Sequence, residues 1–196
     1  MDLSLVHLGG NKLLASKNIL GNELFVNILT SREVELIVST EEQGCKYPAD
    51  SRLNVCILGN YLIENEKYAD KLMASQRPDL KIINVKQGYT KCSICVVDSK
   101  SIITSDKAIA EKAGEAGLNV LLIQAGHVWL PGYDTGFIGG AAFKTAANGL
   151  AFTGRIEGHP DKEKILEFLN DRNVEPIFLT DEPIFDIGSA IPLCEG

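Results

Sequence analysis

The chain repeats one order of predicted elements four times. From Ser93, two apolar runs flank a polar turn at 98–100, a helical period follows Asp106, and a further apolar run begins at Val120. This order predicts two antiparallel strands, a helix and a third strand, a ββαβ unit of about 30 residues. A unit of this size buries too little apolar surface to fold alone, so the copies are expected to pack around a shared core.

The same order predicts the boundaries of the other units. The hairpin turns are separated by 49, 40 and 49 residues and fall at Gly10, Gly59, Ser99 and Asn148. The predicted units cover residues 1–40, 53–85, 93–123 and 141–179. The predicted helix starts are Asn18, Asn65, Asp106 and the region of His159 and Pro160. A last apolar run at 190–193 is typical of the first strand of a fifth unit, so we predict one α/β domain over residues 1–196.

Composition excludes several classes of partner. The net charge is -7 with no basic cluster, and a protein that binds nucleic acid needs a Lys/Arg footprint. Asp2 follows Met1 directly, and no apolar run approaches the roughly 18 residues of a membrane span, so we expect neither a signal peptide nor an anchor. The predicted location is the cytoplasm, with no nucleic-acid or membrane partner.

The five cysteines fit a reducing compartment, where thiols mostly behave as small apolar side chains. Cys92 and Cys95 form a CxxC pattern within a run of strand-like periodicity. Three steps along a strand place two side chains on opposite faces, so these sulfurs are not expected to share a metal ion or a disulfide. We therefore predict no metal and no cofactor.

The connectors that follow the third strands are the most polar parts of the chain. If rotation relates the units, these connectors emerge at one end and converge on an axis, where a small-molecule ligand would bind. Gly139 and Gly140 precede a strand and open no helix, so they are expected to allow close backbone approach rather than to bind a dinucleotide. His159 is interpreted as part of a helix start. Trp129 is interpreted as a cover for the core, with an aromatic lid over a ligand as the alternative.

Several strings resemble one family. They are Lys46-Tyr47-Pro48, Ile57-Leu58-Gly59-Asn60-Tyr61, Val85-Lys86-Gln87-Gly88-Tyr89, Lys91-Cys92-Ser93-Ile94-Cys95, Gly136-Phe137-Ile138-Gly139-Gly140, Asp181-Glu182-Pro183 and Asp186-Ile187-Gly188. The chain resembles an uncharacterised bacterial family with the pentein fold, the fold of guanidine-modifying enzymes. This likeness implies an α/β propeller of ββαβ units, here four units and the first strand of a fifth. Members begin about half a unit earlier, so an open flank is expected, which a second copy of the chain could cover.

The resemblance implies a type of chemistry. Catalytic penteins attack a guanidinium carbon with a Cys thiolate, use a His as acid and base, and hold the cationic substrate with carboxylates. This sequence departs from that pattern. The connector before the third unit has Tyr89, Thr90 and Lys91 where a His-x-Asp element is expected, and the run 188–193 lacks a His-Cys pair, although Cys194 lies close by.

A displaced set of catalytic residues remains as the hypothesis. Cys92 is the predicted nucleophile because the charge of Lys91 would favour its thiolate, and Cys194 is the alternative. His127 and Asp134 complete the predicted catalytic set. The predicted substrate-binding residues are Asp50, Arg52, Lys91, Tyr133, Asp186 and Ser189. The alternatives are a core cysteine at position 92 and a structural histidine at position 127.

Two classes of function follow. The first is a Cys-dependent hydrolase or transferase that acts on a guanidino or amide C–N bond of a small molecule. The second is a non-catalytic module that binds a small molecule or a protein, since the scaffold also occurs in a ribosome-associated factor without catalysis. A doubly wound nucleotide binder or hydrolase is disfavoured, because the hairpin turns at Gly59 and Asn148 place antiparallel neighbours in the sheets.

Overall fold

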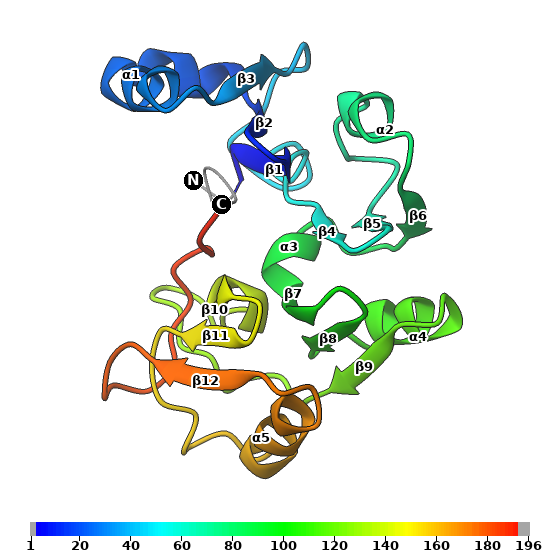
Figure 1. Cartoon of the computed structure of the whole chain (residues 1–196), viewed down its shortest axis with the longest axis vertical. Helices are drawn as coiled ribbons and strands as arrows, with labels where there is room; N and C mark the ends of the chain where they lie inside the picture. The colour runs from blue at the N-terminus through cyan, green and yellow to red at the C-terminus, as the bar shows by residue number, and fades with distance from the viewer. Residues whose placement is uncertain (1–2, 192–196) are drawn as a thin grey trace. The chain divides into compact units, whose positions relative to one another are not determined.

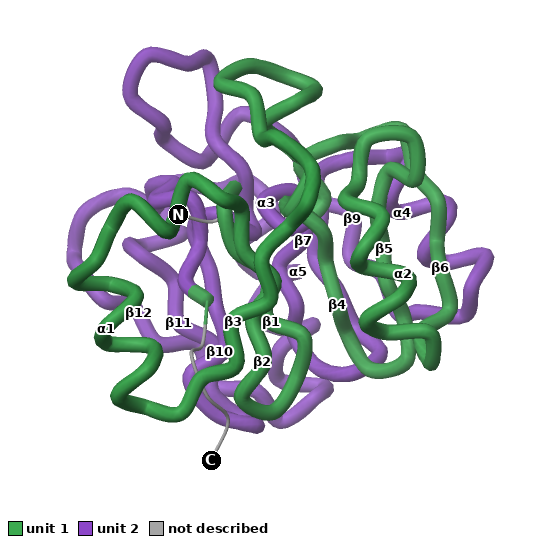
Figure 2. Tube along the Cα trace, turned by 90° about the horizontal axis from the view of Figure 1, so that it is seen from above, with its two compact units in different colours: residues 1–90, 191–196 green, residues 91–190 purple. Residues whose placement is uncertain are grey.

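The computed structural model describes residues 3–191, which form two compact units. Unit 1 comprises residues 1–90 and 191–196, and unit 2 comprises residues 91–190 (Figure 2). The single domain over residues 1–196 stays a prediction, so each unit is described by itself.

The first sheet of unit 1 has the expected strand–strand–helix–strand order. The central strand β2 (Lys12–Ala15) pairs antiparallel with β1 (Leu5–Gly9) and parallel with β3 (Glu35–Val38). A 3-10 turn, η1 (Lys17–Gly21), and α1 (Glu23–Ser31) make the crossover between β2 and β3 (Figure 1). Two parallel neighbours need such a connection, which explains why a helix follows the hairpin.

The second sheet of unit 1 repeats this topology. Strand β5 (Tyr61–Glu64) pairs antiparallel with β4 (Cys56–Leu58) and parallel with β6 (Lys81–Asn84). The crossover helix α2 (Leu72–Gln76) has five residues. Apolar side chains from both sheets of unit 1 and from α2 share one cluster, which includes Leu14, Leu62 and Met73. A second cluster packs α1 on the first sheet through residues such as Leu13 and Leu29.

Unit 2 contains two further sheets of the same kind. In one sheet β8 (Ser101–Thr104) lies between β7 (Ile94–Asp98) and β9 (Asn119–Leu122), and in the other β11 (Gly149–Phe152) lies between β10 (Ala142–Ala146) and β12 (Glu175–Phe178). The crossover helices are α4 (Lys107–Glu115) and α5 (Lys162–Asn170). One apolar cluster includes Ile103 and Leu150 from the two sheets, Phe152, and Ile165 from α5. The topology that the sequence predicts is therefore present in all four sheets.

Two of the predicted helix starts, Asn18 and Asn65, are wrong. Asn18 lies inside η1, and Asn22 caps α1 by accepting a hydrogen bond from Phe25 N at 3.0 Å. The stretch after Asn65 forms turns before α2 begins at Leu72, where Asp70 Oδ1 accepts the amide of Leu72 at 2.9 Å. In each case a polar side chain nearer in the sequence to the first helical residue accepts a backbone amide at the start of the helix.

The structure also corrects the region around Cys92. The residues Thr90–Ser93 form one helical turn, α3, so Cys92 does not lie on a strand as predicted, whereas Cys95 does. The predicted closing strand at 190–193 extends beyond the described residues, as does Cys194, and residues 190–191 are not in a strand. Within residues 3–191, the structure contains no helix of the length and apolarity that crossing a membrane requires.

Candidate functional site

Two predicted site residues from opposite ends of unit 2 meet. Lys91 Nζ donates a hydrogen bond to Ser189 Oγ at 2.8 Å. Lys91 lies in α3, directly before Cys92, and Ser189 lies in the last connector of unit 2, in a left-handed conformation with φ of +89°. The bond therefore joins two segments that are 98 residues apart in the sequence.

Asp186 holds this connector in place. Its carboxylate accepts Phe137 N at 2.8 Å and Gly188 N at 2.7 Å, and the residue is buried. The amides of Ile187 and Ser189 both donate to Gly140 O at 3.0 Å. Asp186 thus lies near Ser189, and each of its oxygens already accepts a hydrogen bond from a backbone amide.

The paired glycines make close contacts, as their sequence pattern predicts. A Cβ atom at Gly140 would overlap the Asp186 carboxylate, and one at Gly139 would overlap the carbonyl groups of Ile94 and Lys91. Any side chain here would push apart the segments that carry Lys91 and Asp186. Cys92, which follows Lys91 directly, is 5% exposed.

His127 lies against a histidine that sequence analysis assigned to a helix start. The ring centroids of His127 and His159 are 5.1 Å apart. His159 Nδ1 accepts the amide of Asp161 at 3.0 Å, so the proton of the neutral ring is on Nε2, which is buried without a partner in the described chain. Burial lowers the pKa of His159, and His127 lowers it further. His159 is therefore kept neutral near physiological pH.

Asp161 ties the connector that carries His127 to α5. Asp161 Oδ2 accepts Gln124 N at 2.7 Å, and Oδ1 accepts Lys164 Nζ at 2.6 Å. The hydrogen bond from Lys164 is the main reason that the pKa of Asp161 is lowered. The carboxylate is therefore ionised and accepts one hydrogen bond at each oxygen. Its role is to position residue 124 and the residues that follow it.

The other predicted residues of unit 2 are on the surface. Tyr133, Asp134 and Trp129 are exposed in the same connector. Within residues 3–191, Asp134 forms no hydrogen bond or ion pair, so its carboxylate is open to a ligand. Trp129 is anchored through its backbone, because its amide donates to Ile184 O and its carbonyl accepts Asp186 N. Its side chain does not cover the core as predicted.

Asp50 and Arg52 belong to unit 1, where each has its own partner. Tyr89 Oη donates to Asp50 Oδ2 at 2.8 Å, whereas Asp50 Oδ1 is buried and has no partner within the described residues. Arg52 forms an ion pair with Glu41. Asp50 therefore keeps one acceptor for a ligand, while the guanidinium of Arg52 is already engaged.

Glu64 is a site candidate that sequence analysis missed. It ends β5, is 4% exposed, and its Oε2 has no partner in the described chain. Burial, with a smaller contribution from Glu66, raises the pKa of Glu64 to about 7. Thr90 Oγ1 donates to the carbonyl of Ile63 at 2.9 Å, which links the end of β5 to the segment that carries Tyr89. The available signal was an acid directly after the apolar run 61–63, at a position expected to face inward.

A family model covers almost the whole chain. The model for a family of unknown function, DUF6873, matches residues 1–191. The chain belongs to this family. A search of curated proteins found no match to the sequence.

Solved structures identify the fold of this DUF6873 member. An agmatine deiminase from C. jejuni superposes with a TM-score of 0.55 and 13% identity over 85% of this chain and 60% of the enzyme. An amidinotransferase from Microseira wollei, of the saxitoxin biosynthetic pathway, superposes with a TM-score of 0.52 and 8% identity over 88% of this chain and 62% of that protein. A cysteine-to-serine mutant of DDAH from Pseudomonas aeruginosa, complexed with citrulline, superposes with a TM-score of 0.53 and 8% identity over 89% of this chain and 66% of that protein.

These similarities confirm the pentein fold expected from the sequence. The three proteins share the fold at identities of 8 to 13%, so the likeness extends to architecture and not to individual side chains. The chain spans 60 to 66% of the length of these structures.

Proposed function

We propose that this protein binds a small molecule through a guanidino or amide group and that the Cys92 thiolate attacks the carbon of that group. The observation that carries the proposal is the hydrogen bond between Lys91 and Ser189. It fixes an ammonium group next to Cys92 in the sequence and brings the last connector of unit 2 to the same place. A nearby cation favours the thiolate, the reactive form of cysteine.

The proposed reaction proceeds in two steps. The thiolate sulfur forms a bond to the guanidinium carbon, one C–N bond breaks, and ammonia or an alkyl amine leaves with a proton that His127 supplies. Water then gives one proton to His127 and a second to solvent as its oxygen bonds to the carbon of the amidino–sulfur intermediate. The C–S bond breaks, which releases the thiolate and a ureido product if ammonia left, or urea if the alkyl amine left. If an amine replaces water, the same intermediate gives a transferase.

A carboxylate with open acceptor atoms would hold the cationic group. In unit 2, the exposed Asp134 keeps both of its oxygens unpartnered within the described residues. Guanidinium groups bind carboxylates through paired hydrogen bonds, so an unpartnered oxygen is the expected recognition element. The fold supports the same chemistry, since its solved examples include a deiminase and an amidinotransferase.

The test is turnover of guanidino compounds by the purified protein. The protein is incubated with agmatine and with arginine, and mass spectrometry follows loss of substrate and formation of ureido or amidino products. Cys92→Ser is expected to reduce turnover at least about a thousandfold, as for other nucleophiles. Cys95→Ala is the buried control, and Cys45→Ser removes the exposed thiol. Turnover that Cys92→Ser leaves unchanged would contradict the assignment.

A second candidate is a binding module without catalysis. It is favoured by the low exposure of Cys92 and by the packing of His127 against His159, a contact that suits a structural histidine. In that case a guanidino compound shifts the melting temperature of both the wild type and Cys92→Ser by the same amount, and no product forms.

A further inference from the structure

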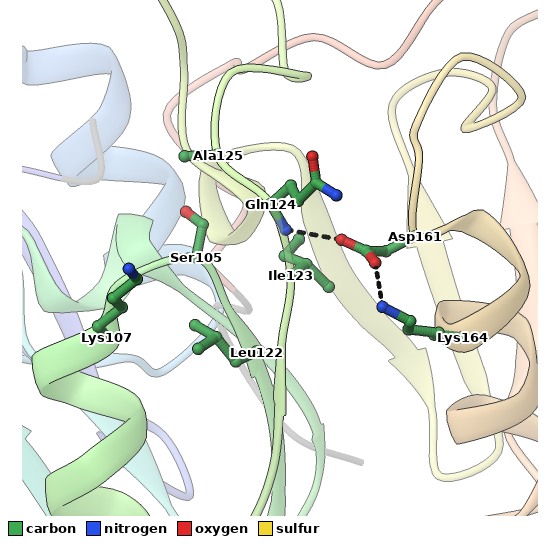
Figure 3. A pocket seen from close by; sticks show the side chains of 8 residues that line it. All are labelled: Ser105, Lys107, Leu122, Ile123, Gln124, Ala125, Asp161 and Lys164. Carbon is green, nitrogen blue, oxygen red and sulfur yellow. Dashed lines mark hydrogen bonds and ion pairs between the residues drawn. The ribbon is translucent and has the colours of Figure 1, made fainter.

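A pocket in unit 2 contains none of the residues assigned to the proposed reaction. Its volume is about 460 Å³, and it lies between the start of α4, the end of β9 and the start of α5. Figure 3 shows Ser105 and Lys107 on one wall and Asp161 and Lys164 on the opposite wall. The lining residues are Ser105, Lys107, Leu122, Ile123, Gln124, Ala125, Asp161 and Lys164.

The charges of the pocket do not cancel. Asp161 supplies the one carboxylate of the lining, and both of its oxygens are occupied by Gln124 N and Lys164 Nζ. Lys164 uses one of its three ammonium protons in this contact. Lys107 has no ion-pair or hydrogen-bond partner for its side chain within residues 3–191. The pocket therefore has two ammonium groups and one carboxylate, and each carboxylate oxygen already accepts a hydrogen bond. The pocket is thus positively charged, although the chain as a whole carries a net charge of -7.

Neutral donors on the same walls are also available. The hydroxyl of Ser105 and the side-chain amide of Gln124 form no hydrogen bond within the described part of the chain. Together with the two lysines they offer four donor groups around one space. The N-terminal amides of α4 do not contribute, because Asp106 Oδ1 already accepts Ala108 N and Ile109 N.

The remaining lining is apolar. Leu122 is 42% exposed, and Ile123 and Ala125 complete this part of the surface. A ligand with a hydrocarbon portion would cover this exposed apolar area while its charged end reached the lysines. Small-molecule sites commonly combine an apolar lining with a few placed polar groups in this way.

We infer that this pocket binds a small organic anion, with Lys107 and Lys164 contacting the charged group and Leu122, Ile123 and Ala125 contacting its hydrocarbon part. Lysine ammonium groups act as point charges rather than as a planar fork, so they accept a carboxylate or a phosphate. The inference goes beyond the proposed function, because it does not depend on Cys92 or on catalysis.

The test is a titration of the full chain with three probes, followed by amide NMR shifts. The probes are benzoate, its neutral analogue benzamide and inorganic phosphate. Benzoate is expected to saturate shifts at residues 105–107 and 122–125 and to bind at least about tenfold more tightly than benzamide. Tighter binding of phosphate than of benzoate at the same residues would support the anion site and assign it to a phosphate group.

Two matched lysine variants show whether benzoate binds in the pocket itself. Lys107→Gln removes a charge without breaking an ion pair of the described structure, and it should weaken benzoate binding about fivefold. Lys100→Gln, in the exposed turn between β7 and β8, makes the same charge change and should leave binding unaltered. The inference is overturned if no anion saturates by about 20 mM, if benzamide binds as well as benzoate, or if the two variants behave alike.

Discussion

Helices α1 and α4 occupy the same place in their sheets but present different surfaces. Each has nine residues and a side-chain cap, and each connects the second strand of a sheet to the third. Helix α1 exposes Leu24 (73%) and Ile28 (40%), whereas the exposed positions of α4 include Lys107, Glu111 and Lys112. The comparison teaches that the repeated topology constrains the inward face of a helix and leaves the outward face free to differ.

The two units also differ in their buried ionisable groups. In unit 1, Glu64 has a pKa raised to about 7, so its native state retains a proton that the unfolded chain releases above about pH 4.5. This contribution to stability is complete below pH 4.5 and is lost as the pH rises through 7. In unit 2, the pKa of His159 is lowered, so its contribution is present above the ordinary histidine pKa and is lost on acidification. Raising the pH therefore removes the stability contribution of Glu64 in unit 1, and lowering the pH removes that of His159 in unit 2.

The largest expected effect tests the contrast between the inward and outward helix faces. Ile109→Ala removes a fully buried side chain of α4 and should lower the free energy of unfolding by about 2–5 kcal/mol. Leu24→Ala in α1 removes an exposed side chain and should change it by less than about 0.5 kcal/mol. Urea denaturation followed by circular dichroism measures both. Similar losses for the two variants would mean that α1 is covered in solution.

Glu64→Gln should reverse the expected loss of stability at high pH. The neutral amide cannot ionise. The free energy of unfolding of the variant, relative to that of the wild type, should therefore rise by about 3 kcal/mol between pH 4.5 and pH 8, at about 1.4 kcal/mol per pKa unit. The difference between the two pH values cancels any fixed effect of the amide. Denaturant unfolding at both values measures the gain. His159→Asn is the counterpart in unit 2, and it should remove a loss of stability on the acid side. A gain for Glu64→Gln that does not depend on pH would exclude the buried carboxyl as its cause.

Substitutions at the helix caps are expected to give the smallest difference in stability. Asp106 accepts two amides of α4, at 2.8 and 3.0 Å, whereas Asn22 accepts one amide of α1, at 3.0 Å. Asp106→Ala should therefore destabilise the protein by about 1 kcal/mol, and Asn22→Ala by less. Thermal melts of the two variants rank the caps. A larger loss for Asn22→Ala would show that the number of bonded amides does not set the difference.

Hairpins were the most predictable elements of this chain. Gly10 and Gly59 both have positive φ and lie in the expected turns between paired strands. A left-handed turn residue between two apolar runs determines the pairing locally, so no distant contact is needed to predict it. Helix starts were less predictable, because Asn18 and Asn22 are both good caps and the choice depends on which one places the apolar residues against the sheet.

The residues of the candidate site could be chosen from the sequence by chemical type, and their assignment to a site stays a prediction. Sequence analysis identified Lys91 and Ser189 as site residues, and the structure brings them together. It assigned Cys92 to a strand and overlooked Glu64. The chemical type of a residue is visible in the sequence, whereas its burial depends on neighbours that come from other connectors.

The sequence by itself determined the order of elements, the four hairpins and the family, because strand periodicity and turn glycines act over a few residues. Only the tertiary structure decided which buried polar atoms of residues 3–191 remain without partners, among them Asp50 Oδ1, Glu64 Oε2 and His159 Nε2. Whether a buried polar atom finds a partner depends on packing between segments distant in the sequence, and that packing carries no local signal.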